Sequence, residues 1–114
     1  MKASKAVSLV FLMMSLCVVN TLPVKAAEDY WTTKAQMPTA RTGFGVAVAN
    51  GKIYAIGGSD GRYLTTNEMY DPSTNTWATK KSMPTKRGHF GIAAHQNKIY
   101  VIGGETGDGP TGVN

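Results

Sequence analysis

The sequence repeats itself at a spacing of 46 residues. The stretch KIYAIGG at 52–58 returns as KIYVIGG at 98–104, and MPT at 37–39 returns at 83–85. Aligned without a gap, residues 31–68 and 77–114 are identical at 18 of 38 positions. Self-similarity at a fixed period of roughly 20–50 residues is typical of architectures in which one structural unit recurs. The chain is therefore expected to consist of successive copies of a single unit.

Each period has the pattern of four short β-strands. Small, branched and aromatic residues alternate in these segments, and turn-forming residues separate them. The Asn50-Gly51 pair predicts a tight hairpin, because both central residues of such a turn need positive φ. Asp71 to Asn75 predicts a second turn. The four predicted strands are 44–49, 52–56, 67–70 and 76–80. Four antiparallel strands in one period predict an all-β fold in which each period is a β-propeller blade.

A few recurring residues have structural roles that the blade geometry explains. Small residues such as Ala47 suit the innermost strand, where blades converge on an axis. A glycine pair ends the second strand, where the backbone turns sharply beside a neighbour. Large rings with polar atoms suit the wedge between blades, with those polar atoms reaching backbone. The structural residues expected on these grounds are Gly57, Gly58, Tyr70, Trp77, Gly103 and Gly104.

The same residues carry a resemblance to the kelch repeat. The double glycine at 57–58, followed at a distance by EMYDP at 68–72, Trp77 and MP at 83–84, is similar to the signature of that family. Arg41 before FG at 44–45 also matches it. The resemblance covers 31–114 and implies a kelch-type β-propeller. WD-repeat blades have a similar length, but their Trp-Asp pair does not occur here.

The number of blades is small for a propeller. Residues 44–80 form one complete blade, 90–104 the first half of another, and 30–34 an outer strand of a third. A closed ring takes roughly four to eight blades, so closure needs further blades in cis or other copies of the chain. We interpret the sequence as the N-terminal part of a longer propeller or a truncated reading frame; assembly of several copies is the alternative.

The first 26 residues have the pattern of a secretory signal peptide. Lys2 and Lys5 precede an uncharged run at 6–19, and small residues flank Lys25. Cleavage is expected after Ala26, which gives a secreted protein that is extracellular, periplasmic or at the cell surface, and no longer associated with a membrane. A retained anchor is the alternative, but 14 apolar residues are fewer than the ~20 that span a bilayer.

Removal of that segment changes the charge and the cysteine content. The net charge falls from +5 to +2, because three of the twelve basic residues lie before residue 27. The high pI therefore gives no reason to expect nucleic-acid binding. The single cysteine, Cys17, is also removed. The mature chain is thus predicted to have neither a disulfide nor a thiol.

Ligand contacts are expected on one face of the blades. In a four-stranded antiparallel blade, the loop before the first strand and the loop between strands two and three lie at the same end. These are the long loops at 37–43, 59–66, 83–89 and 105–113, and long loops on a rigid framework often bind ligands. The candidate ligand-facing residues are Arg41, Asp60, Arg62, Tyr63, Arg87, His89, Glu105 and Asp108.

The two arginines have two interpretations. The kelch resemblance implies that Arg41 and Arg87 look into a central pocket. The other interpretation is that they bond neighbouring loop carbonyls and hold the rim of the blade. Their recurrence in both copies favours this structural role.

No motif for a phosphate-binding loop, a zinc protease or a calcium loop occurs. The sequence contains no GxxxxGK[ST] or HExxH pattern, and residues 105–109 lack the alternating ligands of a calcium loop. We therefore expect no cofactor and no metal, and a binding module that recognises a protein or a carbohydrate. The alternative is the N-terminal part of a kelch-propeller enzyme, similar to sialic-acid epimerases or sugar oxidases, whose catalytic residues lie outside this chain.

Overall fold

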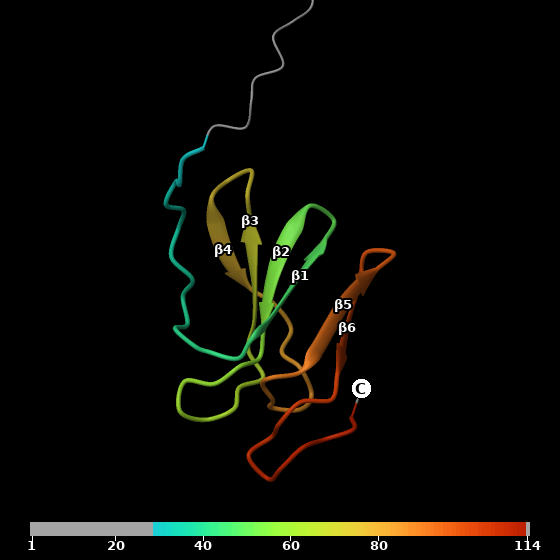
Figure 1. The fold of residues 1–114 in the computed structure, drawn as a ribbon. Coiled ribbons are helices and arrows are strands. Elements are labelled where there is room, and N and C mark those ends of the chain that lie inside the picture. The colour runs from blue at the N-terminus through green and yellow to red at the C-terminus, as the bar shows by residue number, and fades with distance from the viewer. Residues whose placement is uncertain (1–28, 114) are drawn as a thin grey trace, which may run out of the picture. The chain divides into compact units, whose positions relative to one another are not determined.

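The computed structural model describes residues 29–113, and every regular element in that range is a β-strand (Figure 1). The predicted all-β class is therefore confirmed. All six strands lie in the compact unit that begins at Thr33. Within residues 29–113 there is no helix long and apolar enough to cross a membrane. The strands are β1 (Gly45–Ala49), β2 (Lys52–Ile56), β3 (Asn67–Asp71), β4 (Thr76–Thr79), β5 (Gly91–His95) and β6 (Lys98–Ile102).

The first four strands form one antiparallel sheet in the order β1-β2-β3-β4. Its boundaries differ from the predicted ones by one residue at the start of β1 and at the ends of β3 and β4. Asn50 and Gly51 both have positive φ, at 50° and 68°, as the hairpin turn requires. The meander is the four-stranded blade that the sequence predicts.

The second repeat contributes the hairpin β5-β6, which packs against the first sheet through β1. Gln96 and Asn97 occupy its turn with φ of 49° and 57°. The two sheets approach closely at Gly45, where an added Cβ would lie 2.5 Å from the Phe90 ring. The alternating residues of β1 that face this contact are buried, and they are small: Gly45, Ala47 and Ala49. Small side chains on β1 thus let the second repeat pack closely.

A glycine pair ends β2 where the two repeats meet. Gly57 and Gly58 have φ of 62° and 93°, and the Gly58 N–H donates to the Arg87 carbonyl at 2.9 Å. A Cβ on Gly58 would lie 2.6 Å from the backbone oxygen of Thr42. Because this backbone both turns and touches other backbone, the position excludes a side chain.

A glycine pair begins each of the two long loops, Gly57-Gly58 in the first repeat and Gly103-Gly104 in the second, and these loops differ in length. In the first repeat, Gly57 N–H donates to Thr66 O at 2.7 Å. In the second repeat, Gly103 N–H donates to Val113 O at 3.0 Å. The second loop therefore contains one residue more than the first. Beyond that extra residue, the gapless alignment of the repeats no longer pairs structurally equivalent residues.

Tyr70 and Trp77 form a cross-strand pair on β3 and β4. Their ring centroids are 5.2 Å apart, with 45° between the planes. Trp77 Nε1–H donates to the backbone oxygen of Ala35 at 2.9 Å, as expected of a ring that reaches backbone. The Tyr70 hydroxyl instead donates to the Asn75 side chain at 2.8 Å, so the expected backbone contact was wrong for this ring.

The outer strand predicted over 30–34 does not form. None of the described strands pairs with this segment, and a β-strand requires a hydrogen-bonded neighbour. From Thr33 onward the chain runs irregularly toward β1, and Trp77 holds it at Ala35.

Apolar side chains lie exposed on the outward faces of the two sheets. Val46 and Val48 of β1 are 52% and 57% exposed, and Tyr100 and Ile102 of β6 are 47% and 52% exposed. The outer edge of β6 pairs with no other described strand. These are the positions at which adjacent blades pack in a propeller.

Candidate functional site

The long loops of both repeats gather at one end of the strands, opposite the hairpin turns (Figure 1). Backbone contacts join them. Thr42 bridges Ser59 within the first repeat, and Gly88 bridges Glu105 within the second. The His89 N–H donates across the repeats to Gly43 O at 2.8 Å. We call this end the loop face, and it consists of residues 37–43, 59–66, 83–89 and 105–113.

Three of the candidate residues meet on the loop face. The Tyr63 hydroxyl donates to Glu105 Oε2 at 2.6 Å. His89 Nδ1 lies 3.7 Å from the same oxygen, and the rings of Tyr63 and His89 are edge to face with centroids 6.5 Å apart. The hydrogen bond to the Glu105 carboxylate raises the pKa of Tyr63 above its usual value, with smaller contributions from burial and from the negative charge. The raised pKa keeps the Tyr63 hydroxyl protonated, and so able to donate to Glu105, to a higher pH than an isolated tyrosine.

His89 occupies an unusual backbone position in this cluster. Its φ is 51°, a region that side chains other than glycine adopt at a cost. The equivalent residue of the first repeat is Gly43, with φ 61°. The His89 ring packs against Gly43, where an added Cβ would lie 2.6 Å from Nε2. Both repeats thus have a left-handed backbone conformation at this position, and the second repeat places an imidazole side chain there. Strain of this kind is often kept at functional sites.

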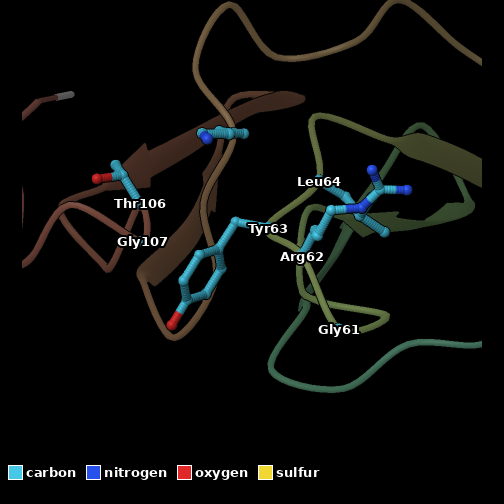
Figure 2. Close-up of a pocket in the computed structure, with 7 residues that line it drawn as sticks. Gly61, Arg62, Tyr63, Leu64, Thr106 and Gly107 are labelled. Atoms are coloured by element: carbon cyan, nitrogen blue, oxygen red, sulfur yellow. The ribbon is translucent and has the colours of Figure 1, made fainter.

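A pocket of about 480 Å³ lies between the loops of the two repeats (Figure 2). Figure 2 shows Tyr63 projecting between the segment that carries Gly61 and the segment that carries Thr106. Two of the lining side chains, Arg62 and Lys86, are cationic, and none is acidic. The lining residues are Gly61, Arg62, Tyr63, Leu64, Lys86, Thr106 and Gly107.

Arg41 does not face the loop surface, so its placement among the ligand-facing candidates was wrong. Its side chain is 0% exposed, and Nη1 lies 2.7 Å from Glu68 Oε2. A second hydrogen bond, of 2.9 Å, joins Nη2 to the Ala55 carbonyl. Arg41 therefore ties the loop before β1 to the middle of the sheet, which is the structural role that its recurrence favoured.

Arg87 is buried in the same way, at 3% exposure, and it too is misplaced among the ligand-facing candidates. Its Nη1 donates to the carbonyls of Gly103 and Val113. Here the partners are backbone oxygens at both ends of the 105–113 loop. Arg87 thus holds the base of that loop, as expected if the recurring arginines bond loop carbonyls at the rim of the blade.

The two aspartates among the candidates lie exposed in the loops, away from the cluster. The Asp60 carboxylate accepts a hydrogen bond from the Arg62 N–H at 3.4 Å, and the Asp108 N–H donates to Thr106 Oγ1 at 3.4 Å. Both interactions are local to their loops. The structure therefore brings together Tyr63, His89 and Glu105.

Two polar residues of the pocket were not among the candidates. Lys86 was missed because it precedes a recurring arginine, although it replaces Ala40 of the first repeat. Thr106 was missed because loop hydroxyls are common. A position-by-position comparison of the two repeats would have identified Lys86, because it differs from Ala40. Within residues 29–113, no group of three or more His, Cys, Asp or Glu side chains is arranged to hold a metal ion.

The meander, the glycine-ended second strand and the loop face define a segment of a kelch-type β-propeller. The family model described as the kelch motif matches residues 40–84 and 86–114. The chain therefore belongs to the kelch-repeat family, and the resemblance noted in the sequence is confirmed.

Known proteins that are similar to this chain include a plant protein and a solved structure. An F-box/kelch-repeat protein of Arabidopsis thaliana is 36% identical over a 70-residue alignment, which covers 53% of this chain and 19% of that protein. A solved structure titled "Structure of YjhT" superposes with a TM-score of 0.63 and 28% identity, over 68% of this chain and 25% of that one. The chain thus spans about a fifth of the length of the curated relative and a quarter of the solved structure.

Proposed function

We propose that this chain is part of a secreted kelch propeller that binds a partner protein through its loop face. Kelch repeats generally form modules for protein interaction, and the family assignment gives that general role. The specific proposal concerns the surface used. Four loops of the two repeats lie together at one end, and a pocket opens between them.

The observation that carries the proposal is that residues of the loop face differ between the two repeats, whereas the residues that build the blade recur. The residues that build the blade recur, among them the glycine pair, the KIY stretch and the buried arginine. In the loops, Ala40 is replaced by Lys86, Gly43 by His89 and Ser59 by Glu105. The fold does not need these three changes, because the first repeat forms the same structure without them. Selection for binding accounts for them.

Export of the protein is the second part of the proposal. Residues 1–26 lie outside the described residues, so it is supported by their composition alone: a basic start, an apolar run and small residues around the cleavage position. Mass spectrometry of the protein recovered from outside the cytoplasm should find Ala27 as the first residue. An intact Met1 in that material would contradict cleavage.

The binding surface is tested by site-specific crosslinking. A photo-crosslinking amino acid is placed at position 108, in a loop of the loop face, and at position 73, in the hairpin turn at the opposite end. We expect a protein partner to crosslink at position 108 and not at 73. Equal yields at both positions, or crosslinks at 73 alone, would contradict the proposal. Binding on a glycan array without any protein crosslink would identify a carbohydrate ligand instead.

A further inference from the structure

We propose that the pocket lined by Arg62 and Lys86 is a subsite for a carboxylate group, supplied by an acidic segment of the partner protein. The inference rests on the loop-face binding proposed above and adds the chemistry of what is bound. It starts from two cations that line one pocket of about 480 Å³.

Neither cation is neutralised inside the described part of the chain. The ion pairs found within residues 29–113 are Arg41 with Glu68 and Lys52 with Asp71, and the His89 ring lies 3.7 Å from Glu105. Arg62 and Lys86 take part in none of them, and both residues are exposed. The pocket therefore has an excess of positive charge that an acidic ligand can complement.

Three acidic residues belong to these loops, Asp60, Glu105 and Asp108, and none of them lines the pocket. Glu105 Oε2 accepts the Tyr63 hydroxyl at 2.6 Å and lies 3.7 Å from His89 Nδ1. Glu105 itself does not line the pocket, whereas the next two residues, Thr106 and Gly107, do. The cluster thus holds the Glu105 carboxylate outside the pocket wall, and within residues 29–113 neither Asp60 nor Asp108 forms an ion pair with Arg62 or Lys86.

The remaining walls suit the carbon chain that bears the carboxylate. The Tyr63 ring and Leu64 also line the pocket, and Figure 2 shows Leu64 next to Arg62. The volume is in the range of sites that enclose a small organic group, and it exceeds what a bare inorganic ion fills. A glutamate side chain offers methylenes for the apolar wall and a planar carboxylate for the forked Arg62 guanidinium.

The cations belong to these loops and not to the repeat. Lys86 stands where the first repeat has Ala40. The bridge from Ser59 to Tyr63 has its equivalent in the bridge from Glu105 to Pro110, so Tyr63 corresponds to a proline in the second repeat. The walls of the pocket are therefore assembled from residues that the blade does not require.

The test uses hexaglutamate and hexaglutamine peptides as matched probes, titrated into the purified protein and its variants. We expect hexaglutamate to bind and hexaglutamine, which is neutral and nearly the same shape, to bind at least tenfold more weakly. Arg62→Gln and Lys86→Gln should each weaken hexaglutamate binding about five- to tenfold, because each removes one charge-assisted contact at an exposed site. Lys98→Gln is the control, since Lys98 is an exposed lysine on β6 in the hairpin-turn half of the molecule. It should leave the affinity unchanged.

Each outcome decides the inference. Equal binding of the two peptides, absence of hexaglutamate binding, or an equal loss in Lys98→Gln would overturn it. A competing effect of inorganic sulfate as strong as that of hexaglutamate would show general anion attraction and would also overturn it. If a protein partner still crosslinks at position 108 in these cases, the proposed function stands and only the carboxylate subsite fails. Circular dichroism of the variants confirms that the exposed substitutions leave the fold intact.

Discussion

The buried pair of Arg41 and Glu68 gives the sharpest test of how this blade is held together. The two side chains are 0% and 4% exposed, and Nη1 lies 2.7 Å from Oε2. Glu68 also accepts a hydrogen bond of 2.7 Å from the Thr39 hydroxyl. Glu68→Gln keeps the shape and removes the charge, which leaves a buried guanidinium without a counter-ion. Breaking a buried pair in this way costs about 3–5 kcal/mol of unfolding free energy.

The double variant Arg41→Met/Glu68→Leu separates pairing from burial. It removes both charges and fills the space with apolar atoms, so it should recover much of the stability lost in Glu68→Gln, because replacing both partners avoids the unpaired charge. The pair of Lys52 and Asp71 in the same sheet, whose side chains are 32% and 19% exposed, is the comparison. Lys52→Gln should cause a much smaller loss, since solvent screens that interaction.

The assay is urea denaturation at neutral pH, followed by two spectroscopic probes whose transitions should coincide. A loss below about 1 kcal/mol in Glu68→Gln, or one equal to that in Lys52→Gln, would refute the reasoning. It would mean that water reaches the guanidinium. Arg41 would then belong again among the ligand-facing residues.

Three further perturbations test the glycine pair, the half-buried Lys52–Asp71 ion pair and the hydrogen bond of Trp77. Gly58→Ala should destabilise the fold much more than Gly61→Ala, because both positions have positive φ but only Gly58 meets backbone within 3 Å; equal losses in denaturation would contradict the steric argument. Hydrogen bonds, first from Lys52 and then from Ser73, lower the pKa of Asp71 to about 2. Stability from this depressed pKa is present above pH ~4 and falls as the pH drops toward 2, so Asp71→Asn should flatten that part of the pH–stability curve. Trp77→Phe removes a 2.9 Å hydrogen bond to the segment before β1, and trypsin should then cut that segment faster; an unchanged rate would show that the bond does not hold it.

The strands could be predicted because their determinants are local. Alternation of residue types, the Asn50-Gly51 turn and the recurrence of the pattern each indicated the same elements, and the observed bounds differ by one residue at most in the first sheet. The gathering of the long loops at one end follows from the order of antiparallel strands. That arrangement needs no knowledge of individual contacts.

The environment of single side chains could not be predicted in this way. The burial of Arg41 depends on Glu68, which is 27 residues away and which no local pattern links to it. The meeting of Tyr63 with Glu105 depends on a separation of 42 residues and on the packing of two repeats. The strand expected over 30–34 depended on neighbours that the described residues do not contain. Contacts that are distant in sequence thus account for most of the differences.

The unequal loops have a consequence for how such a surface can change over time. The glycine pairs close the first loop at Thr66 and the second at Val113, with one residue more in the second and the same hydrogen bonds at its base. An inserted residue is therefore absorbed above the closing bonds, and the strands keep their register. Loop length and loop sequence can vary independently of the blade. A lineage of such proteins can acquire new ligands by insertion and deletion without having to find a new fold.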